Sequence, residues 1–266
     1  MPGAQIVSGG TDLMVEVNFN KRKVTDVIAL KRVSELNTWA VSAELDFVTI
    51  GAGVPYCKME SGEIAALVPA LAQAARTVGS PQIRAAGPLG GNLGTCSPAG
   101  DGLPVLFALD AVVHLRSESS SRDVSIHDFM VGVKRNICNS DEIIVAVTLP
   151  IRSGWQGYAK VGVRNAMVIS TASACLSIDK IKSSAHLALG SVGPTIIRCR
   201  QAEAWIASHH DFASSAPIAE NMAREFAEIA ASEARPIDDH RSTAQYRRHA
   251  ISTMSRRLIT RAFANE

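Results

Sequence analysis

The sequence predicts an α+β fold, in which a mixed first part is followed by a small sheet and then by helices. β-Branched runs at 47–54 and 142–150 predict strands. The Ala- and Leu-rich stretch 63–78 predicts a helix, and residues 201–263 alternate apolar and charged side chains at helical spacing. With 266 residues, 47% of them apolar, the chain can bury a sizeable core.

The elements of the first part follow one another closely. Ile6-Val7 predicts a short buried strand that runs into a glycine turn. Pro69 is expected to begin a helix inside 63–78, because proline suits a first helical turn. A further helix is expected at 104–109. The other strands are expected at 27–30, 47–54, 111–115, 122–126 and 142–150.

Ser153-Gly154 marks the expected domain boundary, which divides the chain into 1–152 and 153–266. The last predicted helix carries several arginines beside an apolar stripe. A solvated basic helix and a helix that faces a partner are both compatible with that pattern. Three apolar runs predict the strands of a small sheet in the second part, at 155–163, 169–178 and 186–192.

Composition excludes several classes of protein. The formal net charge of +2 is too close to zero for a nucleic-acid binder. The apolar stretches are too short for a membrane span, and no signal segment opens the chain. Five scattered cysteines without a Cys-x-x-Cys pair predict no disulfide framework, zinc site or iron–sulfur cluster, and favour a reducing, cytoplasmic setting. No histidine pair has metal spacing and no catalytic triad is visible, so no catalytic or metal-binding residue is expected.

Two glycine-rich segments, 8–12 and 87–101, are the strongest functional signal. Glycine lacks Cβ, so successive N–H groups can face one point and approach an anion closely. Two such segments predict a ligand that carries two phosphates and is held from both sides, as a dinucleotide would be. Neither contains the Gly-Lys-Ser/Thr of a P-loop, and neither is a Gly-x-Gly-x-x-Gly turn of a parallel βαβ unit.

Structural alternatives stay open for these residues. Gly9-Gly10 could form an ordinary turn, and 87–101 a buried crossover loop between packed elements. Asp101 is either a helix cap or a ligand to sugar hydroxyls, because both roles use the same oxygens. Cys96 has no visible base beside it, which argues against a reactive thiol. Lys160, on a predicted strand, is either solvated or directed at a ligand.

Further motifs are spread over nearly the whole chain. Taken together and in their order along the chain, these motifs resemble those of the FAD-binding subunits of the molybdenum hydroxylases. The resemblance is greatest to the bacterial xanthine dehydrogenase medium subunits. The collinearity of these motifs is more specific than any one of them. Besides the two glycine-rich segments, they are 79–84, 103–106, 141–144, 164–171, 194–199 and Tyr246-Arg247.

The resemblance implies a flavoprotein with FAD as its cofactor. The first domain is expected to be an FAD-binding PCMH domain, like that of vanillyl-alcohol oxidase. The second is expected to be a CO-dehydrogenase-flavoprotein-type domain, a three-stranded sheet with helices. Carried over, 5–12 and 88–92 would bind the pyrophosphate and its surroundings, and Lys160 would lie at the isoalloxazine. The expected cofactor-binding residues are Gln5, Ile6, Val7, Ser8, Gly9, Gly10, Thr11, Asp12, Val78, Pro88, Leu89, Gly90, Gly91, Asn92, Thr95, Ser97, Asp101, Ile144 and Lys160.

The resemblance also implies a function. Electrons would pass from the 2Fe–2S clusters of an iron–sulfur subunit to FAD on this chain, and then to NAD⁺ or another acceptor. The substrate would react on a molybdenum cofactor subunit. The alternative is an assembly subunit that has lost FAD, since Pro88 stands where Ser or Thr is common and the family usually begins earlier. A free-standing flavin oxidase is disfavoured, because no catalytic base is visible.

Overall fold

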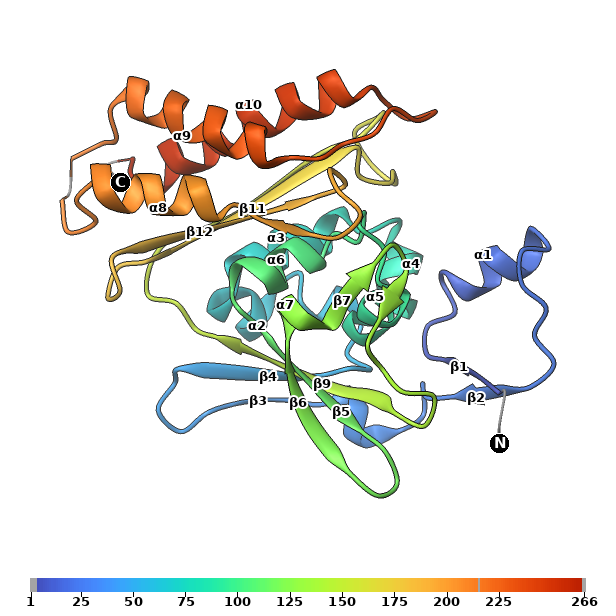
Figure 1. The fold of residues 1–266 in the computed structure, drawn as a ribbon. Helices are drawn as coiled ribbons and strands as arrows, with labels where there is room; N and C mark the ends of the chain where they lie inside the picture. Colours follow the sequence, from blue (N-terminus) through green and yellow to red (C-terminus); the bar gives the residue numbers. More distant parts are fainter. Residues whose placement is uncertain (1–3, 215, 265–266) are drawn as a thin grey trace.

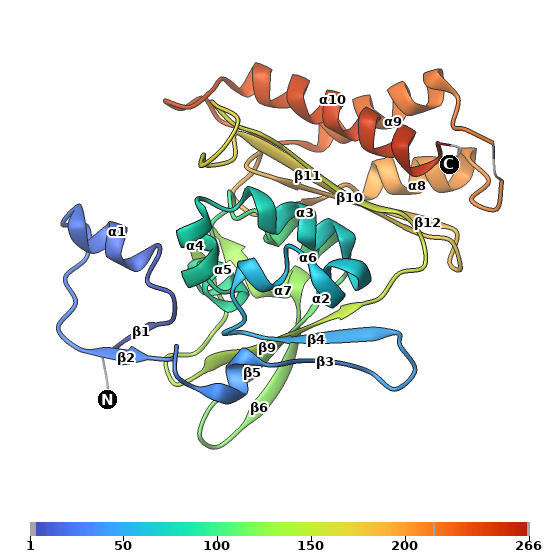
Figure 2. The same cartoon turned by 180° about the vertical axis from the view of Figure 1, so that it is seen from behind.

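The computed structural model describes residues 4–214 and 216–264. Two sheets and two groups of helices alternate as four layers, and a small N-terminal unit stands beside them (Figures 1 and 2). In this unit, strands β1 (Gln5–Val7) and β2 (Val27–Ala29) pair in parallel, and helix α1 (Leu13–Asn18) connects them.

The first large sheet has five antiparallel strands in the order β3-β4-β9-β5-β6. Helices α2, α3 and α6 cover one of its faces (Figure 1). The strands are β3 (Trp39–Val41), β4 (Phe47–Gly51), β5 (Val112–Arg116), β6 (Ser121–Ser125) and β9 (Ile143–Pro150). The helices are α2 (Gly62–Leu67), α3 (Pro69–Thr77) and α6 (Leu103–Ala108).

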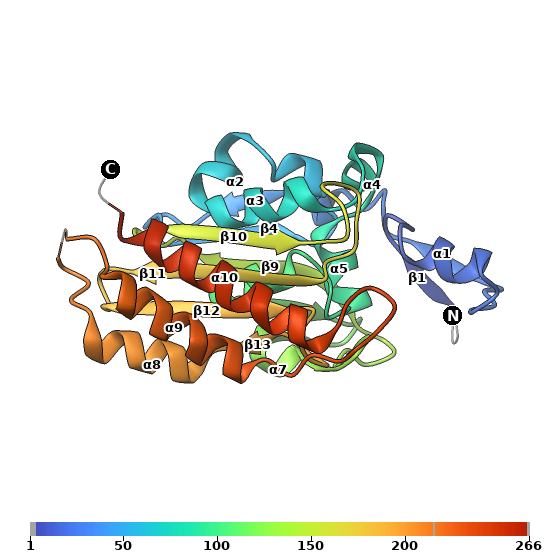
Figure 3. The ribbon, with the colours of Figure 1, turned by 90° about the horizontal axis from the view of Figure 1, so that it is seen from above.

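The second sheet, β10-β11-β12-β13, lies on the other side of α3 and α6 (Figure 1). Helices α8, α9 and α10 cover its outer face (Figure 3). Because α6 is enclosed by two sheets, all six of its residues are buried. The strands are β10 (Gln156–Val161), β11 (Ala172–Asp179), β12 (Ser184–Gly190) and β13 (Ile197–Arg198). The helices are α8 (Arg200–His209), α9 (Glu220–Glu233) and α10 (Ala244–Ala262).

Side-chain alternation along β11 divides the interior into two cores. Leu176 and Ile178 point outward and pack with α8, α9 and α10, whereas Cys175 points inward and joins the core around α3 and α6. The shorter elements connect these layers or border the N-terminal unit. They are η1 (Ser34–Asn37), η2 (Tyr56–Lys58), α4 (Pro81–Ala86), α5 (Leu89–Thr95), α7 (Ile126–Phe129), β7 (Met130–Gly132) and β8 (Arg135–Asn136).

The predicted α+β class is confirmed. The expected helix 63–78 is divided at Val68, and Pro69 is the first residue of α3, as predicted. The three strands expected after residue 153 are present, and a fourth strand of two residues, β13, pairs with β12. None of the helices in the described part of the chain is long and apolar enough to cross a membrane.

Helix α10 turns its apolar stripe inward rather than toward a partner. Ile251 and Ile259 are fully buried in the core against β11 and α9. Arg247 is only 4% exposed, and its guanidinium donates to two backbone carbonyls and to Asp239 (2.7 Å). The stripe is therefore core, and the solvent-facing arginines occupy the opposite side of the helix.

An ion cluster around Asp110 joins the two halves of the chain. The Asp110 carboxylate accepts from His127 Nε2 on α7 (2.8 Å) and Arg198 Nη1 on β13 (2.5 Å), and it lies 3.0 Å from His186 Nδ1 on β12. Burial raises the pKa of Asp110, but the hydrogen bonds from the two histidines and the charge of Arg198 outweigh this effect and hold the pKa well below its usual value.

Replacing this carboxylate tests the cluster. Asp110→Asn removes one of the two carboxylates that pair with Arg198, the other being Glu203. We expect the free energy of unfolding to fall by about 2 kcal/mol at pH 7, discounted for partial exposure. The pKa of Asp110 is lower in the folded chain than in the unfolded one. The contribution of the Asp110 carboxylate to the stability of the folded chain is therefore complete above about pH 4 and is lost as the pH falls further. Urea unfolding at several pH values measures both effects.

The exposed Asp128 on α7 provides the matched control. Asp128→Asn makes the same chemical change outside the cluster, and we expect it to leave the free energy of unfolding within about 0.5 kcal/mol of the wild type. Equal stabilities for Asp110→Asn and Asp128→Asn at pH 7 would show that the cluster does not stabilise the packing of the two halves.

Candidate functional site

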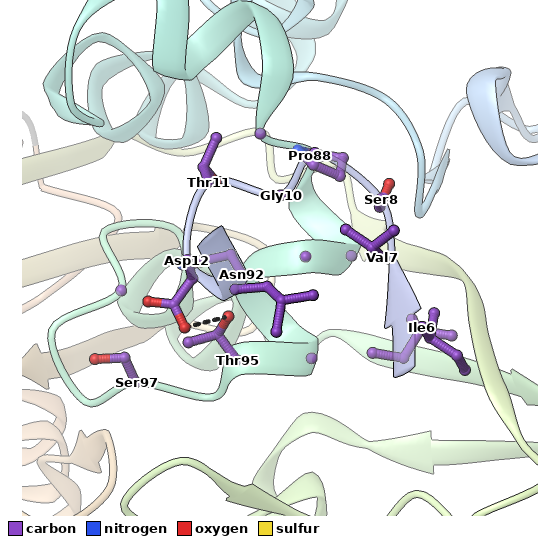
Figure 4. A pocket seen from close by; sticks show the side chains of 18 of the residues that line it. Ile6, Val7, Ser8, Gly10, Thr11, Asp12, Pro88, Asn92, Thr95 and Ser97 are labelled. Atoms are coloured by element: carbon purple, nitrogen blue, oxygen red, sulfur yellow. Dashed lines mark hydrogen bonds between the residues drawn. The ribbon is translucent and has the colours of Figure 1, made fainter. Parts of the chain in front are cut away.

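A cleft of about 930 Å³ separates the N-terminal unit from α4 and α5. Both glycine-rich segments line it, one from each side, and Figure 4 shows the 8–12 segment facing Asn92 and Thr95 of α5. Its volume is at the upper end of the range for small-molecule sites, which suits a large extended ligand. The cleft also reaches the β10–β11 loop at Met167 and Ile169.

The first segment presents free backbone donors to the cleft. Among the hydrogen bonds of the described residues, the N–H groups of Gly9, Gly10, Thr11 and Asp12 donate to no protein acceptor. Gly10 has φ +70°, which turns the chain between β1 and α1. Successive unpaired N–H groups that line a cavity form an anion-binding concavity, so this segment is suited to phosphate.

Gly9 fixes where this segment lies. A Cβ placed on Gly9 would lie 2.1 Å from the carbonyl oxygen of Ala86, at the end of α4. Only glycine allows the two backbones to approach so closely. The first segment is therefore held directly against the start of the second.

The second segment is not the loop that the sequence predicts, because residues 89–95 form helix α5. The N–H groups of Leu89 and Gly90 donate to carbonyls of the segment after β4 (3.2 and 2.9 Å), and the next two donate to Pro88 (3.1 and 3.3 Å). The expected cluster of free N–H donors is therefore absent here. Apolar side chains account for the helix, since Leu89 and Leu93 are fully buried in the core.

The glycines of α5 have two different roles: one allows close packing, and two leave the surface of the helix open. A Cβ on Gly90 would lie 2.5 Å from the Cβ of Ala52, so this glycine seats the helix against the segment after β4. A Cβ added to Gly94 would meet nothing within 4 Å, and a Cβ added to Gly91 would contact only the ring of Pro88. Since both line the cleft, α5 offers a smooth backbone surface on which a flat or extended ligand can lie.

A buried carboxylate lies at another part of the cleft. Asp101 is 7% exposed, and it accepts from Lys160 Nζ on β10 (2.6 Å) and from the Tyr158 hydroxyl (3.0 Å). Burial raises the pKa of Asp101, and the charge of Lys160 opposes that shift. Gly102 holds the cap position of α6, so Asp101 is not the helix cap that the sequence also allowed.

The structure brings most of the expected residues together. All of them line the cleft except Leu89, which is buried in the core, and Lys160, which stands behind Asp101. Cys96 is buried, and burial raises the pKa of its thiol to about 12, which agrees with the expected lack of reactivity. The described residues contain no group of three or more metal-ligating side chains.

The sequence patterns did not indicate two residues at the rim of the cleft. Lys134, in the turn between β7 and β8, donates to Glu16 Oε1 (2.7 Å) and Asp12 Oδ2 (3.3 Å). Asn136, at the end of that hairpin, donates to the carbonyl of Gly94 (3.1 Å). No local sequence pattern predicts the contacts of Lys134, because more than a hundred residues separate it from its two carboxylate partners.

The arrangement fits an extended dinucleotide. Free N–H donors suit a pyrophosphate, the glycine face of α5 leaves room for the ligand, and the buried Asp101 can accept from hydroxyl groups. FAD, when bound, supplies reversible transfer of electrons. The chain itself supplies position and electrostatics.

Comparisons with known proteins bear on the same point. Residues 1–152 match the family of the FAD binding domain in molybdopterin dehydrogenase, and residues 158–262 match the CO dehydrogenase flavoprotein C-terminal domain. The FAD-subunit of nicotinate dehydrogenase from Eubacterium barkeri is 34% identical over 74% of this chain and 70% of its own length. The xanthine dehydrogenase FAD-binding subunit of Escherichia coli O157:H7 is 27% identical over 99% of this chain and 90% of its own length.

Solved structures agree in fold. Carbon monoxide dehydrogenase from Hydrogenophaga pseudoflava matches with a TM-score of 0.87 at 23% identity, covering 100% of this chain and 91% of that chain. The sequence match spans more than half of the chain, and the layers and the cleft accord with it. The chain therefore belongs to the FAD-binding medium subunits of the molybdenum hydroxylase family, oxidoreductase components whose cofactor is FAD.

Proposed function

We propose that this chain is the electron-transfer subunit of a molybdenum-containing hydroxylase similar to xanthine dehydrogenase. It takes electrons from the 2Fe–2S clusters of an iron–sulfur subunit and passes them, through FAD, to NAD⁺ or another acceptor. A molybdenum cofactor subunit carries the substrate chemistry. Relatives named as medium chains and as subunits of dehydrogenase complexes support this assignment.

The observation that carries the proposal is the run of free N–H groups at 9–12, facing the glycine surface of α5 across one cleft. We assign the pyrophosphate to these donors. Thr95, Ser97 and Asp101 hold the sugar chain, and the backbone of Ile144 and the side chain of Val78 border the rings. On this assignment, the main phosphate contacts come from the first glycine-rich segment rather than from the second.

The pair of Asp101 and Lys160 sets the charge at one part of the cleft. Lys160 Nζ is held between Asp101 (2.6 Å) and the carbonyl of Thr77 (3.0 Å), and its side chain is only 7% exposed. A buried cation near the flavin favours the reduced, more negative form, and the fixed contacts keep Lys160 from moving away.

The remaining assignments belong to the same proposal. The division into 1–152 and 153–266 is supported by the gap between the two family matches, since the first ends at residue 152 and the second begins at residue 158. A reducing, cytoplasmic setting is supported by the five cysteines, which are all free thiols. Purine is the proposed substrate class, and a heterotrimer the proposed assembly, on the likeness to xanthine dehydrogenase subunits.

The visible spectrum of the purified chain tests the function. We expect flavin absorption bands that bleach when dithionite is added, and that return in air. A folded chain that stays colourless with excess FAD would instead support the alternative, an assembly subunit that has lost the cofactor. Circular dichroism of the same sample shows whether the chain is folded.

Gly94 offers a test of the glycine surface. Gly94→Ala and Gly94→Leu place side chains into open space, so we expect the chain without FAD to melt at the same or a higher temperature. In the holoprotein the added side chain overlaps the cofactor, and the Kd for FAD should rise with its size, by about tenfold or more for leucine. Fluorescence titration with FAD measures the Kd.

Gly132→Ala is the control for this series, because a Cβ there makes only ordinary contacts and Gly132 does not line the cleft. Its Kd for FAD should equal that of the wild type. An unchanged Kd for Gly94→Leu would place FAD elsewhere.

Lys160 offers a test of the electrostatics. We expect Lys160→Met to lower the FAD midpoint potential by about 30–60 mV, since the removed cation favours the reduced form. Lys58→Met, an exposed lysine on η2, is the control and should leave the potential unchanged. Spectroscopic redox titration measures the midpoint potential of each variant. Equal potentials for the two variants would show that Lys160 does not tune the flavin.

A further inference from the structure

Lys134 bridges the rim of the cleft between the β7–β8 hairpin and helix α1. Its ammonium group donates to Glu16 Oε1 (2.7 Å) and to Asp12 Oδ2 (3.3 Å). Thr95 of α5 reaches the same oxygen of Asp12 (3.4 Å), as the dashed line in Figure 4 shows. Asp12 and Glu16 both line the cleft, so these contacts close its rim.

The hairpin side of this bridge is fixed to the body of the protein. Lys134 donates its backbone N–H to the carbonyl of Cys96 (3.1 Å), just after α5. Asn136 donates to the carbonyl of Gly94 (3.1 Å). Lys134 has φ +54° in the two-residue turn, formed with Val133, that joins β7 to β8. The ammonium group is therefore presented from a rigid support.

Apart from the close approach of Gly9 to Ala86 and the hydrogen bond between Thr95 and Asp12, few contacts hold the other side of the bridge. Helix α1 has no buried residue, and all three residues of β2 are exposed. Arg22 also lies 3.5 Å from Glu16, but both belong to the N-terminal unit, so that pair does not cross the cleft. Elements with few buried contacts open at low free-energy cost, so the N-terminal unit is the part of the cleft wall that can move.

We propose that Lys134 is a positioning residue that latches the N-terminal unit over FAD and slows release of the cofactor. The inference rests on the proposed placement of FAD in this cleft. Lys134 acts through Glu16 and Asp12, and it also cancels their charge beside an anionic ligand. The side chains of Lys134 and Asp12 are 43% and 47% exposed, so the latch is weak, reversible and sensitive to salt.

Glu16 separates a latch from a simple charge effect. Glu16→Gln removes a negative charge beside an anionic cofactor. If Lys134 served only to neutralise charge, this variant would release FAD more slowly than the wild type. If the contact holds the rim closed, the same variant loses the ion pair and releases FAD faster.

The experiment measures FAD release from the full-length holoprotein, by the recovery of FAD fluorescence after dilution. At low ionic strength we expect Lys134→Met and Glu16→Gln each to raise the release rate by about two- to five-fold. The double variant should be no faster than the Lys134→Met single variant, because both remove one interaction. In about 1 M salt all rates should converge. Lys31→Met, an exposed lysine outside the cleft lining, should match the wild type throughout.

Two results would overturn the latch: release by Glu16→Gln slower than by the wild type, or equal rates for all variants at low salt. Both leave FAD binding itself intact, so they count against the latch alone. A wild-type chain that binds no FAD would instead overturn the proposed function, and the latch with it.

Discussion

The close approach of two backbones at glycine determines the shape of the site. Gly9 meets the carbonyl of Ala86 at a distance that excludes any side chain, and Gly90 does the same against Ala52. The first contact places the turn after β1 against the junction of α4 and α5, and the second seats α5 against the first sheet. Between them the cleft is left open. A larger residue at either position would force the walls apart.

The cleft also depends on how the two halves of the chain pack. Asp101 precedes α6, in the layer between the sheets, whereas Lys160 comes from β10 of the second sheet. Their 2.6 Å contact therefore exists only while the second sheet lies on α3 and α6. The ion cluster at Asp110 holds the same packing at another point. Stability and the electrostatics of the cofactor site are thus coupled through one interface.

Sequence patterns predicted much of this architecture, because they report local physics. Pro69 marked the start of α3, since proline has a fixed φ and lacks an N–H. The Gly-rich character of 87–97 suggested a loop, yet residues 89–95 are helical because Leu89 and Leu93 gain more from burial than glycine loses in helix propensity. Lys134 could not be found from sequence, since its partners are distant in the chain and only the fold brings them together.

The central claim is that the free amides of the first segment, rather than those of α5, hold the pyrophosphate of FAD. Amide NMR spectra of the ¹⁵N-labelled chain with and without FAD test it directly. We expect FAD to shift the amide resonances of Gly9 to Asp12 strongly and to protect them from hydrogen exchange. The amides of Leu89 and Gly90, already bonded to protein carbonyls, should keep their exchange rates. Protection confined to α5, with 9–12 unchanged, would contradict the account.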